Sequence, residues 1–322
     1  MREIDRNTCE FPTRRNFLRG CTAAAAVAAL PGSILAAAGS ATDALLTRPI
    51  PATGEPLPVI GLGTNAYGVT DAAEVAKRQA VIARLVELGA KVIDTAQAYG
   101  DSELVVGRIL KDLKARERIF LATKTPMQGE LADPARAVAE SFERLQTDRL
   151  DLLQIHNMHG VAELMPTMRK FKEDRRVRYL GATTSRDEQY PALLAAIREY
   201  PLDFVQVDFS IANRNAAAEV LPLAGERRVA VLVNMPFGGR RDGNLLRKLG
   251  ERPLPPWAAE IGAGSWAELL LKYVLSYPTV TCAIPGTTSV ANLETNLRAA
   301  RGPLPDAALR RRMEEHWDSL GI

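Results

Sequence analysis

The feature that most constrains this fold is an alternation of short, β-branched apolar runs with longer helical patterns, repeated about eight times along residues 42–322. Parallel strands need a crossover connection, usually a helix, so this alternation predicts a parallel sheet. Eight units favour a closed (β/α)8 TIM barrel. The alternative is an open, doubly wound sheet, but residues 61–66, GLGTNA, lack the third glycine of its usual fingerprint. The strands are expected at Val59–Ala66, Val92–Ala96, Ile119–Lys124, Leu150–His156, Val177–Thr183, Phe204–Phe209, Ala230–Met235 and Thr281–Gly286.

Segments outside the repeat flank the expected barrel. Thr47–Pro58 has a Thr-Gly pair between short extended pieces, which predicts a hairpin that closes the bottom of the barrel. The residues after the last repeat predict an extra C-terminal helix. Pro236–Gly264, rich in glycine, arginine and proline, reads as a functional loop that folds over a ligand; a surface insertion is the alternative. Helices are expected at Asp71–Leu88, Pro134–Leu145, Trp266–Leu275 and Val290–Ala300.

The first residues have the order of an export signal. Arg14 and Arg15 precede Phe17-Leu18, an alanine-rich run at 21–38 and small residues at 36–41. This order predicts a twin-arginine-type signal peptide at 1–41, with the barrel domain at 42–322. The export machinery would then be a partner and the periplasm the destination. An uncleaved membrane anchor is the alternative, but alanine is barely apolar enough to hold a helix in lipid, so no stable membrane insertion is expected.

Composition excludes several other classes of protein. With 41 basic against 38 acidic residues, the net charge of +3 offers no surface for nucleic acid. Cys282 alone would remain after the signal, which rules out an internal disulfide, and 3 histidines make a metal site improbable. No exposed apolar helix stands out, so a monomer is expected.

Four polar residues lie at or just after the ends of three consecutive expected strands: Asp94, Tyr99, Lys124 and His156. Each alone has an ordinary structural explanation, such as a helix cap or a buried core histidine. In a barrel, however, strand ends gather at one mouth, where active sites lie. A lysine ammonium lowers the pKa of a nearby tyrosine from about 10, a carboxylate holds the lysine, and a histidine orients a substrate oxygen. Such a set delivers a proton while a hydride carrier supplies electrons.

These residues resemble the aldo-keto reductases. Residues 94–103, DTAQAYGDSE, are similar to the D-T-A-x-x-Y-G-x-S-E signature of that family, and the segments ending at Lys124 and His156 match its lysine and histidine strands. The resemblance covers residues 45 to 300. It implies a barrel that binds NADP(H) across its mouth and reduces an aldehyde or ketone, with Tyr99 as the general acid, tuned by Lys124 and Asp94, and His156 positioning the carbonyl.

The resemblance also implies a set of cofactor contacts, with some departures from the family pattern. Thr184 stands where relatives often have asparagine. Asn234 stands where many have an aromatic residue that stacks on the nicotinamide, and Phe237 is taken as the substitute for that aromatic residue. Residues 285–292 lack the usual base for the 2′-phosphate, although Arg240 and Arg241 offer charge; NADP(H) is therefore favoured and NAD(H) stays open. The expected cofactor contacts are Gly63, Thr64, Thr183, Gln206, Phe237, Thr287, Asn292 and Asn296.

Two other functions fit the same residues. One is a non-catalytic barrel that keeps its cofactor as a sensor or docking protein, and the other is a Schiff-base lyase that uses Lys124. The carbonyl substrate is not specified by the sequence. The residues expected to line the substrate pocket are Asn65, Tyr67, Asn157 and Met158.

Overall fold

The computed structural model describes residues 44–127, 131–239 and 243–322. The expected signal at 1–41, with its paired arginines, lies outside the described residues, as do Arg240 and Arg241. Among the helices of the described ranges, none combines the length and the apolar character needed to cross a bilayer.

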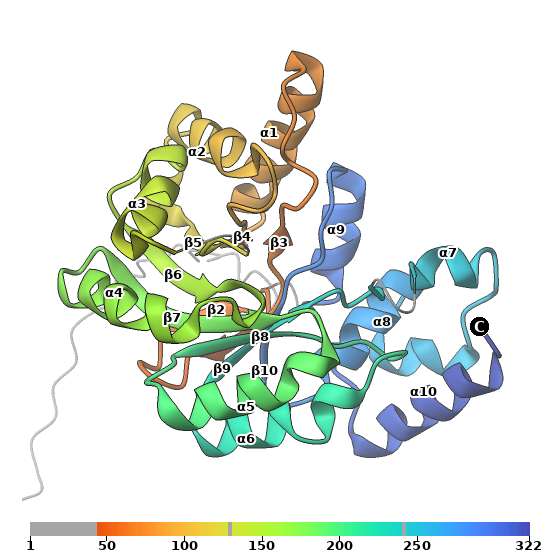
Figure 1. Ribbon diagram of the computed structural model, residues 1–322. Helices are drawn as coiled ribbons and strands as arrows, with labels where there is room; N and C mark the ends of the chain where they lie inside the picture. The colour runs from red at the N-terminus through yellow and green to blue at the C-terminus, as the bar shows by residue number, and fades with distance from the viewer. Residues whose placement is uncertain (1–43, 128–130, 240–242) are drawn as a thin grey trace, which may run out of the picture. The chain divides into compact units, whose positions relative to one another are not determined.

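Eight parallel strands form the centre of the fold, in the order β10-β9-β8-β7-β6-β5-β4-β3 (Figure 1). Parallel bridges between Ile60 and Ala283 and between Gly63 and Gly286 join the two edge strands, which closes the barrel. The expected (β/α)8 fold is confirmed. The strands are β3 (Leu62–Gly63), β4 (Val92–Asp94), β5 (Phe120–Lys124), β6 (Leu150–Ile155), β7 (Val177–Thr184), β8 (Phe204–Asp208), β9 (Ala230–Asn234) and β10 (Val280–Ala283).

Several strands are shorter than the sequence predicts, and two of these, β3 and β10, lie where the barrel closes. A Cβ on Gly63 would come within 2.8 Å of the main-chain oxygen of Ile284, so the two backbones are unusually close here. The Tyr67 amide then donates to the Thr64 oxygen, which turns the chain and ends β3. The expected strand at Val59–Ala66 therefore ends in a turn, and the expected strand at Thr281–Gly286 continues past Ala283 only as an isolated bridge at Gly286.

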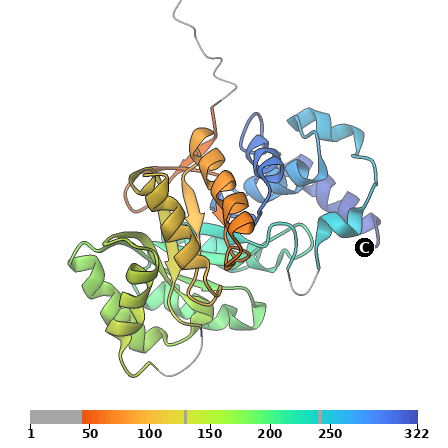
Figure 2. The same ribbon diagram turned by 90° about the horizontal axis from the view of Figure 1, so that it is seen from above.

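Helices surround the strands, as the view from above shows (Figure 2). Local caps explain where they begin. The Asp71 side chain accepts the Glu74 amide, and the Asp133 side chain accepts the Arg136 amide with a proline in the first turn. The α-helices are α1 (Ala72–Glu87), α2 (Ser102–Asp112), α3 (Pro134–Arg144), α4 (Val161–Glu173), α5 (Tyr190–Glu199), α6 (Val220–Glu226), α7 (Leu245–Leu249), α8 (Trp266–Leu275), α9 (Val290–Arg298) and α10 (Ala307–Ser319).

The N-terminal hairpin pairs β1 (Thr47–Pro49) with β2 (Pro56–Pro58), as expected. Its residues Ile50 and Leu57 are fully buried in the cluster that fills the barrel interior, beside Phe120 and Phe204. The Tyr179 hydroxyl at the start of β7 lies 2.8 Å from the Thr53 hydroxyl, which fastens the hairpin. The hairpin thus closes one end of the barrel and leaves the strand-end mouth as the open one.

The segment after β9 is partly helical, which the sequence did not suggest. It contains α7 and a 3-10 helix at Pro256–Ile261. The expected extra C-terminal helix is α10, and its Met313 and Trp317 are buried against Trp257 and Leu269. The long segment is therefore anchored beside the barrel, while its first residues turn toward the mouth.

Candidate active site

A bonded chain of three side chains lies at the barrel mouth. Asp94 ends β4 and Lys124 ends β5, and the ammonium Nζ of Lys124 is 2.5 Å from Asp94 Oδ2. The same ammonium donates to Tyr99 Oη at 3.2 Å and to the Thr95 main-chain oxygen at 2.9 Å. Parallel pairing of β4 with β5 sets neighbouring strand ends side by side, so residues far apart in sequence share one site.

The electrostatic interactions among these three side chains keep Lys124 charged. Burial opposes the charged form of Lys124, but the charges of Asp94 and Tyr99, with their hydrogen bonds, outweigh burial and raise its pKa. Asp94 and Lys124 are only 2% and 1% exposed, so their attraction acts in an interior with little screening. Tyr99, by contrast, is half-buried and faces the cavity. A fixed positive charge therefore stands behind a phenol that a substrate can reach.

His156 completes the set from the end of β6. Its ring lies edge-on to the Tyr99 ring, with centroids 5.9 Å apart. Burial, and then the charge of Lys124, lower the pKa of His156 to about 3. The imidazole is thus neutral at physiological pH, and it adds no second positive charge to the site.

Two buried amides hold the other oxygen of Asp94. Gln206 Nε2 donates to Asp94 Oδ1 at 3.1 Å, and Gln154 Nε2 donates to the same atom at 3.2 Å. Thr183 Oγ1 donates in turn to Gln206 Oε1 at 3.0 Å. Gln154 was not expected from the sequence analysis. A lone glutamine inside the apolar run of β6 nevertheless indicates a polar partner inside the barrel, because a buried amide is costly without a hydrogen bond.

A cavity of about 690 Å³ opens at this mouth. It brings together the four catalytic candidates and five of the expected cofactor contacts: Gly63, Thr64, Thr183, Gln206 and Phe237. Asn65 and Asn157 also line it, as expected. The expectation is wrong for Tyr67 and Met158, which do not line the cavity. The Tyr67 ring is fully buried, because the turn after Gly63 carries it into the core, where its hydroxyl donates to the Thr287 oxygen.

The three remaining expected contacts, Thr287 just before α9 and Asn292 and Asn296 within it, lie outside the cavity lining. Thr287 Oγ1 accepts the Ser289 amide, and Ser289 caps the helix by accepting the Asn292 amide. Asn292 is exposed, whereas Asn296 is buried. These residues stand beyond Gly286, the last residue of the lining on this side, so only an extended ligand would reach them.

The segment after β9 supplies a further wall of the cavity. Asn234, Met235, Pro236 and Phe237 line it, and Asn244 at the start of α7 closes the wall. Asn234 is half-buried, and its Oδ1 is buried with no hydrogen-bond partner among the described residues. The expectation that the beginning of Pro236–Gly264 reaches the ligand site is therefore consistent with its position.

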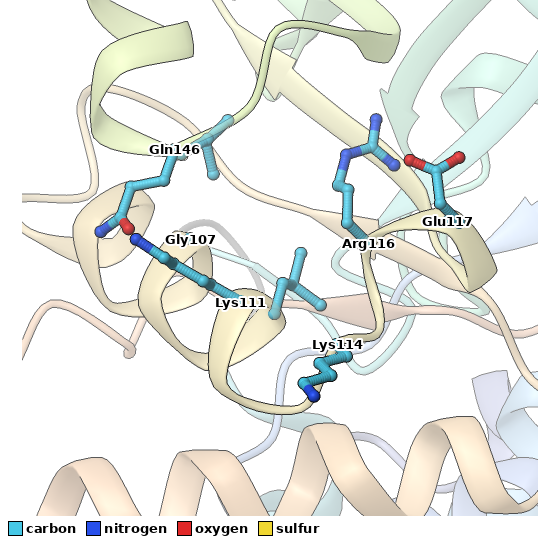
Figure 3. A pocket seen from close by; sticks show the side chains of 8 residues that line it. Gly107, Lys111, Lys114, Arg116, Glu117 and Gln146 are labelled. Carbon is cyan, nitrogen blue, oxygen red and sulfur yellow. The ribbon is translucent and has the colours of Figure 1, made fainter.

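A second hollow, of about 280 Å³, lies outside the barrel near the ends of α2 and α3 (Figure 3). Its charged side chains include Lys111 and Arg116, but Arg116 is committed to Asp151 at 3.1 Å and to main-chain oxygens. A Cβ on Gly107 would meet the Leu145 backbone at 2.5 Å, so this hollow borders a tight helix contact. It lacks the proton-transfer set of the barrel mouth.

In the described ranges, no three His, Cys, Asp or Glu side chains gather into a group that could hold a metal ion. Cys282 is a buried free thiol inside the barrel, and burial raises its pKa above the usual value.

Comparison with known proteins decides the family. Residues 59–318 match the model of the Aldo/keto reductase family. This chain belongs to the aldo-keto reductases. It is 31% identical over 208 residues to aldo-keto reductase YhdN of Bacillus subtilis, covering 60% of this chain and 61% of that relative. It is 28% identical over 258 residues to methylglyoxal reductase YeaE of Escherichia coli, covering 79% and 89%.

A solved aldo-keto reductase shares the fold. The structure from Klebsiella pneumoniae in complex with NADP and acetate has a TM-score of 0.67 and 27% identity, with 81% of this chain and 93% of that chain covered. An aldo-keto reductase is an oxidoreductase, and relatives named as reductases do not favour the non-catalytic alternative. The bond of the Lys124 ammonium to Asp94 also disfavours a Schiff-base lyase, which needs a neutral amine.

Proposed function

We propose that this aldo-keto reductase transfers hydride from NADP(H) to a carbonyl carbon, with Tyr99 as the proton donor. The observation that carries the proposal is the Lys124 ammonium held between Asp94 and Tyr99 at the mouth of a cavity large enough for a cofactor head and a small substrate. The relatives bound to NADP support the cofactor.

The cavity wall fits a nicotinamide ring. Thr183, Gln206 and Asn234 place a hydroxyl and two amides on one side, and the unpartnered Asn234 Oδ1 can accept from a carboxamide. Gly63 and Gly286, without side chains, leave the backbone open beside them. When bound, the cofactor supplies the hydride. Phe237 would stack on the nicotinamide, and Thr287, Asn292 and Asn296 would meet the adenosine end of the cofactor.

The chain's own residues perform the proton chemistry. Tyr99 faces the cavity and releases its proton to the substrate oxygen, while Lys124 stabilises the phenolate that remains. Asp94 keeps Lys124 charged and fixed. Neutral His156 lines the cavity beside Tyr99, so its imidazole can hold the substrate oxygen by a hydrogen bond.

The substrate proposed is a small polar aldehyde or ketone. Asn65, Asn157 and Ser185 give the lining amide and hydroxyl groups, and the only aromatic rings in its described part besides His156 are Tyr99 and Phe237. The relative named methylglyoxal reductase supports small carbonyls.

Fluorescence titration with NADPH and, separately, NADH, followed by turnover on a panel of carbonyls, tests this function. We expect saturable binding of NADPH, tighter than NADH, and oxidation of NADPH that depends on a small carbonyl. Folded, cofactor-free protein that binds neither nucleotide would contradict the proposal.

We also propose that the protein is a monomer exported to the periplasm by the twin-arginine machinery, guided by the order of residues in 1–41. Because a released cofactor is not re-reduced outside the cytoplasm, the folded enzyme would carry its cofactor out and cycle it between two substrates. Gel filtration of the periplasmic fraction should give a monomer with cofactor absorbance in the protein peak. The variant with Arg14→Lys and Arg15→Lys should stay in the cytoplasm. Wild-type protein found only in the cytoplasm, or the same periplasmic amount of both proteins, would exclude this route.

A further inference from the structure

We propose that Gln154 is a positioning residue of the reaction, acting on Tyr99 through Asp94 and Lys124. Gln154 lies on β6, two residues before His156, which directly follows the strand, and Gln154 is fully buried. Its Nε2 donates to Asp94 Oδ1 at 3.2 Å, on the opposite carboxylate oxygen from Lys124. This inference rests on the proposed role of Tyr99 as the proton donor.

The position of Gln154 is costly for stability. Its Oε1 is buried with no hydrogen-bond partner among the described residues, and an unsatisfied buried polar atom destabilises a fold. An apolar side chain of the same length would avoid that cost, because its neighbours inside the barrel include Leu152 and Phe204. The unpartnered Oε1 thus offsets part of the stability that the Nε2 bond to Asp94 gives, and the distinct role of a glutamine here is to hold the Asp94 carboxylate.

The barrel also makes room for this side chain. Gln154 is in register with Lys124 on one side and with Gly181 on the other. A Cβ on Gly181 would lie 3.0 Å from Gln154 Cγ, so the missing side chain at that position leaves the space along which Gln154 extends to Asp94.

The chemistry follows from how the charge of Asp94 is shared. Hydrogen bonds from Gln154 and Gln206 stabilise the negative charge on Oδ1. Without the Gln154 bond, the carboxylate holds a proton more readily and shares the Lys124 proton more strongly. Less positive charge then remains beside Tyr99, the phenolate is less stable, and the phenol becomes a weaker acid.

Gln154→Met tests this, because methionine keeps the length of the side chain and removes the donor. We expect kcat for carbonyl reduction to fall about tenfold, with KM and NADPH affinity within about twofold. The alkaline limb of the kcat profile should move to higher pH. The melting temperature should stay close to that of the wild type, because loss of the bond to Asp94 is offset by removal of the unpartnered Oε1. Leu152→Met, which places the same side chain at an inward position of β6 without a bond to Asp94, is the matched control.

A second readout needs neither cofactor nor substrate. The ultraviolet absorbance of each protein is recorded as pH rises, and the curve of the same protein carrying Tyr99→Phe is subtracted. The difference is the titration curve of the Tyr99 phenol, and its midpoint is compared between variants. We expect its midpoint to move to higher pH in Gln154→Met and to stay unchanged in Leu152→Met. Gln154→Glu should keep the bond to Asp94 only while the new carboxyl holds a proton and can donate it; its kcat should therefore approach the wild type at acid pH and fall as pH rises.

An unchanged midpoint and pH profile in Gln154→Met would overturn the proposal, and so would a loss of kcat that only accompanies a lower melting temperature. The wild type, in the same assay, reports separately on the proposed function. If it reduces no carbonyl while the midpoint still shifts, the proposed reaction fails but the link from Gln154 to Tyr99 stands.

Discussion

Tyr99→Phe should lower kcat for carbonyl reduction by about 10²- to 10⁴-fold, the usual contribution of a positioned general acid. The substitution removes one oxygen and leaves the ring against His156. NADPH affinity should stay within about twofold, because the expected cofactor contacts on β7 and β8 are untouched. Stopped-flow reduction and fluorescence titration of the same preparation measure the two effects.

Tyr179→Phe is the matched control for this change. It removes the same oxygen at the opposite end of the barrel, where the hydroxyl bonds Thr53 and Glu55. We expect stability to fall slightly and kcat to be unchanged. Near-normal turnover in Tyr99→Phe would mean that another group or water donates the proton. The roles proposed for Asp94 and Lys124 in tuning Tyr99 would then be wrong as well.

The pH dependence of the wild type should follow the same logic. Reduction needs a protonated Tyr99, so kcat should fall on the alkaline side and lose that limb in Tyr99→Phe. His156 has its pKa lowered to about 3 and stays neutral over the working range. It therefore adds no acid limb near neutral pH.

The sequence predicted the catalytic set because the fold class and the residue types constrain each other. Once an eight-unit parallel barrel is accepted, Asp94, Lys124 and His156 must emerge at one mouth, because each ends a neighbouring strand. The structure places them together as expected. The starts of α1 and α3 were equally accessible, since Asp71 and Asp133 cap them with side chains that are local in sequence.

What the sequence could not give depended on packing between distant segments. The shortening of β3 follows from its backbone approaching Ile284, more than two hundred residues away, and the same turn buries Tyr67. Gln154 was missed because its partner is on another strand. A glutamine inside an apolar run shows that a bond is needed but does not say to which residue.

Lys124→Met should be the most damaging single change, because it removes the ammonium from the active site and leaves Asp94 buried without its partner. Asp94 is 2% exposed, and breaking a buried ion pair on one side typically costs about 3–5 kcal/mol. We expect the free energy of unfolding in urea to fall by that amount. Turnover should fall to the level of Tyr99→Phe, because the phenolate would lose the charge that stabilises it.

The double variant Asp94→Asn with Lys124→Met separates these two effects. Asparagine keeps an oxygen that accepts from Gln154 and Gln206, and its amide can donate to the Thr95 oxygen that Lys124 vacates. Without a buried charge, the double variant should regain stability to within about 1 kcal/mol of the wild type, since neutral replacements of buried pairs are often tolerated. Its turnover should stay as low as that of Lys124→Met. Recovery of turnover along with stability would show that the pair serves only the fold, and that the ammonium does not tune Tyr99.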